Sequence, residues 1–193
     1  MERVPLLLTL LRIALAPVVA ANALVGGNRA VFAVCLVAAF LSDIFDGVIA
    51  GRLGIATPGL RRLDSVADSL FYVAATFAVW LLHPQSIADR TVLLGALVIL
   101  ELVRYAVDFA KFRREASYHM WSSKLWGVAL FAAFMSLLAF GADNALVTAA
   151  IVLGILCDIE GLLISFVLKR WQSDVPTLAA ALRLAREQRQ LSN

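Results

Sequence analysis

The sequence lacks most of the features that mark a soluble, zinc-binding or nucleic-acid-binding protein. Its only two cysteines, Cys35 and Cys157, lie inside apolar runs and form no zinc motif. It has no internal repeat, no low-complexity tract and no polar stretch long enough for a separate soluble domain. The net charge is +3, but no basic groove interleaved with aromatic residues is present. We therefore expect no nucleic-acid partner.

What the chain has in abundance is apolar residues. It has 193 residues, of which 62% are hydrophobic, and its mean hydropathy is +0.86. Soluble domains are about 45–50% apolar, so this composition indicates a membrane protein. A bilayer core about 30 Å thick requires roughly 20 apolar residues per helix. The apolar runs place six spans at residues 5–25, 30–50, 63–83, 91–110, 121–140 and 145–168.

We therefore predict an all-α integral membrane protein with a six-helix transmembrane domain at residues 1–170 and a tail at residues 171–193. Gly26-Gly27-Asn28 predicts a turn, and residues 51–62 predict a loop with Pro58-Gly59 as its breaker. Apolar and basic residues recur on different faces of the tail. This pattern predicts a short amphipathic helix, lying on the cytoplasmic membrane surface or solvated without a function.

The distribution of basic residues predicts the orientation. Basic residues gather in the segments on one side of the predicted spans, and only Arg29 and Arg90 lie near the loops of the other side. The positive-inside rule then places both termini in the cytoplasm, as in a multi-pass protein of a bacterial inner membrane. Ala21-Asn22-Ala23 resembles a signal-peptide cleavage site, but Arg12 interrupts the apolar run before it. We expect the first helix to be retained. The basic residues of the cytoplasmic side are Arg3, Arg52, Arg61, Arg62, Lys111, Arg113, Arg114, Lys169 and Arg170.

Four aspartates stand out against this apolar background. Asp43 and Asp46 are three residues apart, and Asp64 and Asp68 are four apart. Both spacings place a pair on one helix face. A carboxylate in a membrane helix costs roughly 2.5–3.5 kcal/mol on insertion scales. Four of them near the cytoplasmic ends of two neighbouring spans indicate a shared polar site.

A metal site is the interpretation that best fits these aspartates. Four carboxylates in a low dielectric repel one another unless a cation is present. Their hard oxygen ligands suit Mg²⁺, Mn²⁺ or Ca²⁺, and two such ions would clamp a phosphoryl group. Gly47 leaves room for a ligand or another helix beside Asp46. Ala50, one turn further on, adds only a small side chain to the same side of the helix. The alternative is a set of structural salt bridges with nearby arginines such as Arg61 and Arg62.

The segment resembles the signature of the CDP-alcohol phosphatidyltransferases, D-x2-D-G-x2-A-R-x8-G-x3-D-x3-D. Residues matching it in identity and register are Asp43, Asp46, Gly47, Ala50, Asp64 and Asp68. Thr57 stands where many members carry a small hydroxyl residue. Pro5 to Arg12 resembles the family's P-N-x-x-T-x-x-R opening without its Asn. The chain departs from the signature at Gly51, where Arg is expected and Arg52 is one place late, and at Leu60, where Gly59 is one place early.

The resemblance implies transfer of a phosphatidyl group from a CDP-linked lipid, such as CDP-diacylglycerol, to an alcohol, with release of CMP. It implies two divalent cations, Mg²⁺ or Mn²⁺, and a homodimer. Asp68 would be both a metal ligand and the general base. The metal ligands would be Asp43, Asp46, Asp64 and Asp68. The nucleotide contacts would be Thr9, Arg12, Gly47, Ala50, Arg52 and Thr57.

The acceptor is the least constrained part of this expectation. Loop arginines and lysines would attract a phosphorylated polyol such as glycerol 3-phosphate, although the positive-inside rule explains them as well. Glu101, Arg104, Tyr105 and Asp108 form a polar stripe, in which Arg104 pairs with Asp108 four residues on or binds the acceptor. Lys124 either reaches the acceptor pocket or extends to the membrane interface. The candidate acceptor residues are Arg61, Arg104 and Lys124.

Two other functions would also use clustered aspartates. An aromatic prenyltransferase also uses Asp-rich motifs and Mg²⁺, but that family usually has more spans and an Asn where this chain has Ser42. A cation carrier would use the carboxylates as an ion path. The outer halves of the spans have no acidic residues at similar depth, which argues against a carrier.

Overall fold

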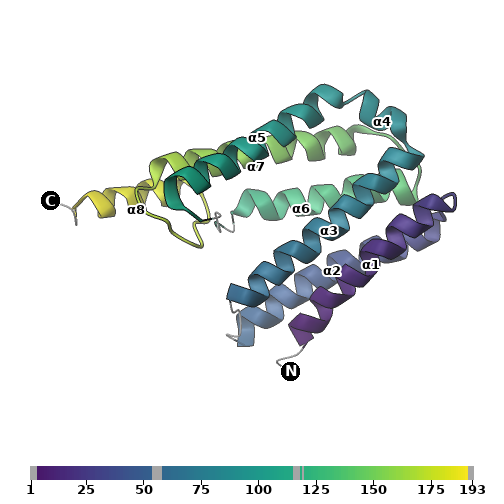
Figure 1. The fold of residues 1–193 in the computed structure, drawn as a ribbon, viewed down its shortest axis with the longest axis horizontal. Coiled ribbons are helices and arrows are strands. Elements are labelled where there is room, and N and C mark those ends of the chain that lie inside the picture. Colours follow the sequence, from purple (N-terminus) through teal and green to yellow (C-terminus); the bar gives the residue numbers. More distant parts are fainter. Residues whose placement is uncertain (1–3, 54–57, 115–117, 119, 191–193) are drawn as a thin grey trace. The chain divides into compact units, whose positions relative to one another are not determined.

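The computed structural model describes residues 4–53, 58–114, 118 and 120–190; the side chains of residues 50–53, 58, 61 and 188–190 lie outside this description. Every regular element in the described residues is helical (Figure 1). The elements are α1 (Val4–Leu24), α2 (Arg29–Leu53), α3 (Pro58–Leu82), α4 (Pro84–Ala88), α5 (Thr91–Phe112), α6 (Trp121–Phe134), the π-helical turn η1 (Met135–Ala139), α7 (Ala145–Val167) and α8 (Leu178–Gln190). The all-α prediction is confirmed.

Five segments within these helices are long and apolar enough to cross a membrane: Val4–Leu24, Arg29–Ile49, Arg62–Leu82, Trp121–Ala139 and Ala145–Val167. They coincide with five of the six predicted spans. The sixth prediction, residues 91–110, falls on α5, which is helical but carries Glu101, Arg104 and Asp108. Because of these charges, α5 is not among the five apolar segments.

The predicted loop at residues 51–62 is wrong in its bounds. Helix α2 continues to Leu53, and α3 begins at Pro58. Pro58 opens the helix instead of breaking it, because the first turn needs no backbone N–H donor and the proline φ already suits a helix. The connection between the two aspartate pairs is therefore shorter than the sequence suggested.

The turn between α1 and α2 forms as predicted. Gly26 and Gly27 have φ angles of +99° and +75°, a region that favours glycine. Asn22 and Asn28 close the turn: the Asn22 side chain donates to the Asn28 carbonyl at 3.0 Å and accepts from the Asn28 amide at 3.1 Å. Asn28 also accepts from the Ala30 amide at 2.9 Å, which begins α2.

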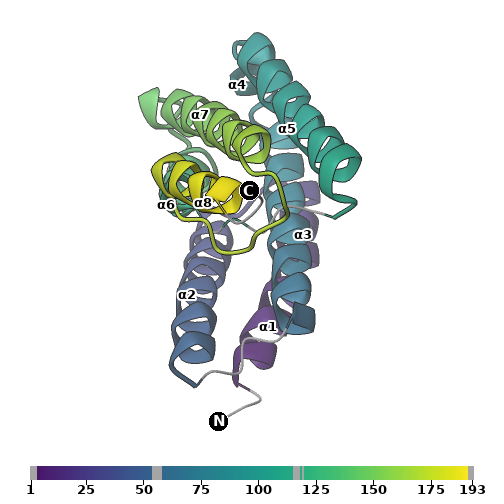
Figure 2. The ribbon, with the colours of Figure 1, turned by 90° about the vertical axis from the view of Figure 1, so that its left-hand side faces the viewer.

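The helices form two compact units. The first contains Met1–Asp89 and Ala133–Asn144, and the second contains Arg90–Ala132 and Ala145–Asn193. In the first unit α1 packs against both α2 and α3 (Figures 1 and 2), and η1 packs against α2 and α3. In the second unit α7 packs against α5 and α8.

One face of α1 supplies its contacts in the first unit. Its buried residues recur every three or four positions, so they lie along one side of the helix. This face also carries polar residues among its apolar ones, so the packing of α1 brings polar side chains to the helix interface. The buried residues are Pro5, Thr9, Arg12, Ala16, Val19, Asn22 and Ala23.

Small residues line the matching face of α3. Ala67, Ala74, Ala75 and Ala78 are buried there, and short side chains allow helix backbones to approach closely in a membrane. The close approach of α1, α2 and α3 brings the polar ends of these helices together.

In the second unit, a buried apolar cluster joins α7 to α8. It includes Ile164, Leu168, Val175 and Ala181, each no more than 1% exposed. The amphipathic tail helix is therefore confirmed, but its apolar face packs against protein. Arg183 and Arg186 remain exposed on its other side.

Gly154 lets α7 approach its neighbours, and Gly154→Ala is expected to destabilise the fold. An added Cβ would lie 2.7 Å from Trp126 Nε1 and 2.9 Å from Leu97 Cδ1. The rigid indole must shift, at a cost of about 1–3 kcal/mol. Thermal unfolding in detergent measures this cost. Gly95→Ala on α5 is the control, since a Cβ there meets no atom within 4 Å. Equal stability of both variants would contradict the close contact.

Candidate functional site

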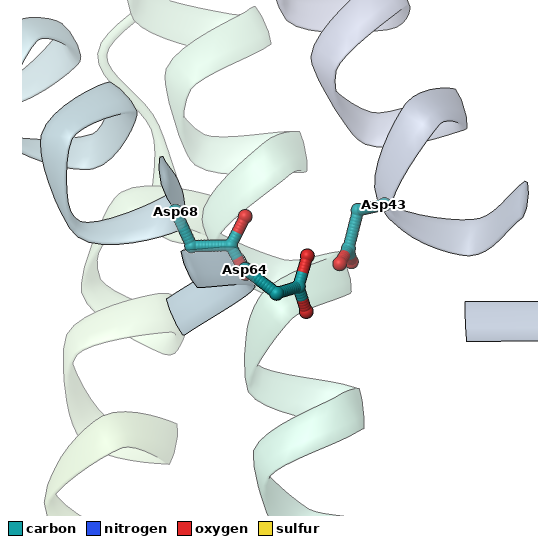
Figure 3. Close-up of side chains that lie close together, drawn as sticks. All are labelled: Asp43, Asp64 and Asp68. Atoms are coloured by element: carbon teal, nitrogen blue, oxygen red, sulfur yellow. The ribbon is translucent and has the colours of Figure 1, made fainter. Parts of the chain in front are cut away.

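The structure brings the predicted aspartates together across α2 and α3. Ligand oxygens of Asp43, Asp64 and Asp68 all lie within 4.8 Å of one another. In Figure 3 the side chains of Asp64 and Asp68, from α3, and that of Asp43, from α2, extend into the same space. The spacing predicted that each pair shares one helix face, and the convergence required in addition that the two faces meet.

The four carboxylates differ in their access to solvent. The side chain of Asp46 is only 6% exposed, whereas those of Asp43, Asp64 and Asp68 are 47%, 35% and 33% exposed. Asp46 also receives a long hydrogen bond of 3.5 Å from Thr9 Oγ1, which donates to the Pro5 carbonyl at 3.0 Å as well. The site thus has a buried carboxylate at its base and three accessible ones around it.

Arg12 contacts all four aspartates. Its Nη1 donates to Asp43 Oδ1 at 3.1 Å and also to Asp68 Oδ1. Its Nη2 donates to Asp46 Oδ2 and Asp64 Oδ1. The side chain is only 1% exposed, and Nε has no hydrogen-bond partner among the residues that the structure describes. The guanidinium therefore links α1 to both α2 and α3.

This role of Arg12 was missed by reasoning from the sequence. The sequence suggested Arg61 and Arg62 as salt-bridge partners because they are close to Asp64, and it suggested Arg12 as a nucleotide contact. The signal that identifies Arg12 is its position on α1: Thr9, Arg12 and Ala16 lie on the face that packs against the other two helices. An arginine on that face needs carboxylate partners.

The donor set fits a hard divalent cation. All its ligands are carboxylate oxygens, which Mg²⁺ and Mn²⁺ prefer, and three of them converge from two helices. Four ionised carboxylates carry a charge of −4, and the guanidinium of Arg12 carries +1, so the cluster retains −3. A further cation would therefore be strongly attracted to the exposed side of the cluster.

The other predicted nucleotide contacts are placed only in part. Gly47 lies on α2 one residue after Asp46, and a Cβ added there would meet no atom of the described residues within 4 Å. The side chains of Ala50 and Arg52 and the whole of Thr57 lie outside the described residues. The bare surface at Gly47 is consistent with a slot for a ligand.

The candidate acceptor residues Arg104 and Lys124 belong to the second unit, and the side chain of Arg61 is not described. Arg104 Nε lies 3.4 Å from Asp158 Oδ1 in an ion pair. It also packs over Gly161, where a Cβ would lie 3.0 Å from Arg104 Cδ. Lys124 Nζ lies 4.8 Å from the centroid of the Trp121 ring. These contacts give Arg104 a structural partner and leave its acceptor role a prediction.

The structure also places two acids whose roles the sequence left open. Asp158 is 2% exposed and pairs with Arg104 through Oδ1, whereas its Oδ2 has no partner within residues 4–53, 58–114, 118 and 120–190. Glu160, two residues on, points elsewhere and accepts from the Leu178 amide at 3.2 Å. A carboxylate at this position complements the N-terminus of α8.

A polar network joins the C-terminal end of α5 to the C-terminal end of α7. Ser165 Oγ donates to Asp108 Oδ1 and lies 3.0 Å from the Tyr118 hydroxyl. Lys111 Nζ donates to the carbonyls of Ser165 and Phe166 at 2.9 and 3.0 Å, which suits a cation at the end of α7. Burial raises the pKa of Tyr118, so its phenol stays neutral at physiological pH.

Comparison with known proteins agrees with this site. The family model for CDP-alcohol phosphatidyltransferase matches residues 2–171, which include all four aspartates and parts of both units, but not α8. No curated protein and no solved structure gives a significant match. The family name describes transfer of a phosphatidyl group from a CDP-alcohol to an alcohol, so the chain is a transferase, and its apolar helices indicate a multi-pass membrane protein. The chain belongs to the CDP-alcohol phosphatidyltransferase family.

Proposed function

We propose that the protein transfers a phosphatidyl group from a CDP-linked lipid such as CDP-diacylglycerol to an alcohol and releases CMP, as a step of phospholipid biosynthesis. The observation that carries this proposal is the convergence of Asp43, Asp64 and Asp68 within 4.8 Å. The family match supports a CDP-linked donor and an alcohol acceptor. The prenyltransferase and carrier functions have no comparable support.

The proposed cofactor is a pair of divalent cations, Mg²⁺ or Mn²⁺, held by the four aspartates Asp43, Asp46, Asp64 and Asp68. When bound, such ions neutralise the donor diphosphate and stabilise charge on the departing CMP. The three exposed carboxylates and the buried Asp46 fit this role because they offer only hard oxygen ligands.

Asp68 is the proposed general base. Its side chain is 33% exposed, so an acceptor hydroxyl has access to it. Asp68 takes the hydroxyl proton as the acceptor oxygen forms its bond to the phosphatidyl phosphorus. The bond from that phosphorus to the bridging oxygen breaks, and CMP departs with the electron pair. Asp68 Oδ1 accepts a hydrogen bond from Arg12. The proton therefore goes to Oδ2, or to Oδ1 after Arg12 has moved away.

The remaining residues bind and orient the substrates. The cytidine would lie against Gly47 and Ala50, with Thr9, Arg12, Arg52 and Thr57 near the nucleotide. Arg61, Arg104 and Lys124 would attract the acceptor, proposed to be a phosphorylated polyol such as glycerol 3-phosphate. The lipid tails of the donor would stay in the bilayer, with the site at the cytoplasmic side of a bacterial inner membrane. The proposed assembly is a homodimer.

An assay of CMP release tests this proposal. We expect purified protein, given CDP-diacylglycerol and glycerol 3-phosphate, to release CMP with Mn²⁺ or Mg²⁺ and to stop when EDTA removes the metal. Inositol phosphate, inositol, serine and choline complete the acceptor panel. Mass spectrometry of the lipid product separates transfer from hydrolysis, which a sample without acceptor also controls. No CMP with any acceptor would contradict the proposal, and metal flux into vesicles would then favour the carrier.

A further inference from the structure

Arg12 binds carboxylate oxygens of the same aspartates that would be the ligands of a metal ion. Each of the four aspartates uses one oxygen to accept from Arg12, and three of these aspartates form the convergent carboxylate group. A guanidinium has five N–H donors. The four on Nη1 and Nη2 match the four carboxylates, and only the Nε donor is left over. A cation that binds the same oxygens has to compete with Arg12.

The contacts of Arg12 satisfy neither the charge of the four aspartates nor all the hydrogen-bond donors of the guanidinium. One positive charge faces four carboxylates, so the cluster has an excess of three negative charges when all four are ionised. The Nε donor is buried and has no acceptor in the described part of the chain, which is unfavourable inside a protein. Two divalent ions would bring the charge of the four carboxylates to zero. Divalent ions are therefore stronger counter-ions for the cluster than Arg12.

We propose that Arg12 is an internal counter-ion that holds the metal-free site together, that metal binding displaces its guanidinium from the aspartates, and that the displaced guanidinium then binds a phosphate of the CDP-linked donor. The last part rests on the proposed function. A planar guanidinium can bind phosphate oxygens through two parallel hydrogen bonds. It cannot do so while its Nη1 and Nη2 donate to carboxylates. Binding is therefore ordered, with metal before nucleotide.

The accessible side of the cluster supports an exchange of this kind. Asp43, Asp64 and Asp68 are between a third and a half exposed, so a hydrated ion reaches them without opening the fold. Asp46, only 6% exposed, lies on the far side with Thr9. Metal arriving at the exposed carboxylates competes first for the contacts from Arg12 to Asp43, Asp64 and Asp68.

The direct test uses the unmodified chain and phenylglyoxal, which reacts with accessible arginine guanidines. In EDTA we expect Arg12 to be protected, because it is 1% exposed and bound to four carboxylates. With saturating Mn²⁺ its modification should speed up about tenfold or more, because a protected group reacts only in the fraction of molecules in which it is released. Adding CDP with Mn²⁺ should protect it again. Peptide mass spectrometry reports Arg12, with exposed Arg183 as the internal control.

A metal titration gives a second, independent readout. We expect Arg12→Gln to bind Mn²⁺ roughly tenfold more tightly than the parent chain, because the internal competitor is gone. In the presence of Mn²⁺ it should bind CDP more weakly. Arg12→Lys keeps the charge but loses the planar fork, and should also bind CDP more weakly. Arg90→Gln is the matched control, since Arg90 donates to Thr148 in the second unit.

Each outcome either supports or overturns the proposal. Arg12 that stays protected in Mn²⁺, or weaker Mn²⁺ binding by Arg12→Gln, overturns the exchange. Exposure by Mn²⁺ without protection by CDP overturns the phosphate contact and keeps the exchange. Neither readout requires turnover. Metal-dependent exposure of Arg12 in a protein that releases no CMP would therefore refute the proposed function and support the exchange.

Discussion

Asp68→Asn is expected to lower metal-dependent CMP release by about 10²–10⁴-fold, the usual contribution of a positioned general base. The amide has nearly the same shape as the carboxylate but accepts no proton at neutral pH. Asp68 is 33% exposed and bonds Arg12, so the substitution leaves space and backbone unchanged. Steady-state rates at saturating Mn²⁺ measure the effect on turnover apart from any loss of metal affinity.

Asp89→Asn is the matched control for Asp68→Asn. Asp89 is an exposed acid after α4 that accepts from Gln85 Nε2 at 2.7 Å, and an Asn can keep this hydrogen bond. We expect its rate to equal that of the parent chain. An Asp68→Asn protein with the parent rate would exclude Asp68 as the base, whatever its role as a ligand. A loss of rate that excess Mn²⁺ fully restores would make it a ligand only.

The second large effect is expected on stability. Arg104→Met should lower the free energy of unfolding by about 3–5 kcal/mol, because it leaves Asp158 buried without its ion-pair partner. Removing both charges should be far less harmful, so Arg104→Met with Asp158→Leu should recover most of the loss. Unfolding in detergent, followed by circular dichroism, measures both. Exposed Arg183→Met on α8 is the control and should lie within about 0.5 kcal/mol of the parent.

The same pair of variants separates the two roles weighed for Arg104. If Arg104 only supports the fold, the stable double variant keeps its KM for the acceptor. If Arg104 also binds the acceptor, the double variant shows a raised KM at restored stability. If the double variant is as unstable as Arg104→Met, the ion pair is not the main contribution of Arg104 and Asp158 to the free energy of unfolding.

Much of the fold and the centre of the site could be predicted from the sequence. Long apolar runs require helices in a bilayer, since the backbone must satisfy its own hydrogen bonds there. The spacing of Asp43 with Asp46 and of Asp64 with Asp68 gave their shared faces directly. These predictions depend on local periodicity, which a single sequence contains.

The errors concern contacts between segments distant in the chain. The partner of the aspartates is Arg12, 31 residues from Asp43, and no local pattern links the two. The error at Pro58 is local. Proline can end one helix or begin the next, and the sequence around Pro58 did not show that a helix begins at this residue. The tail helix was correctly predicted as amphipathic. That its apolar face packs against α7 could not be predicted, because the periodicity of α8 shows an apolar face but not the element that this face contacts.

The contacts of Arg12 also have a consequence for how the chain enters the bilayer. Helix α1 leaves the ribosome before α2 and α3, so Arg12 has none of its four carboxylate partners when α1 first meets the insertion machinery. An unpaired arginine within a span is unfavourable, at most about 2.5–3.5 kcal/mol on insertion scales when it lies at the centre. The aspartates of α2 and α3 carry a similar penalty of their own. Integration of the three helices as one group, after α3 has been synthesised, lets these charges enter the membrane already paired.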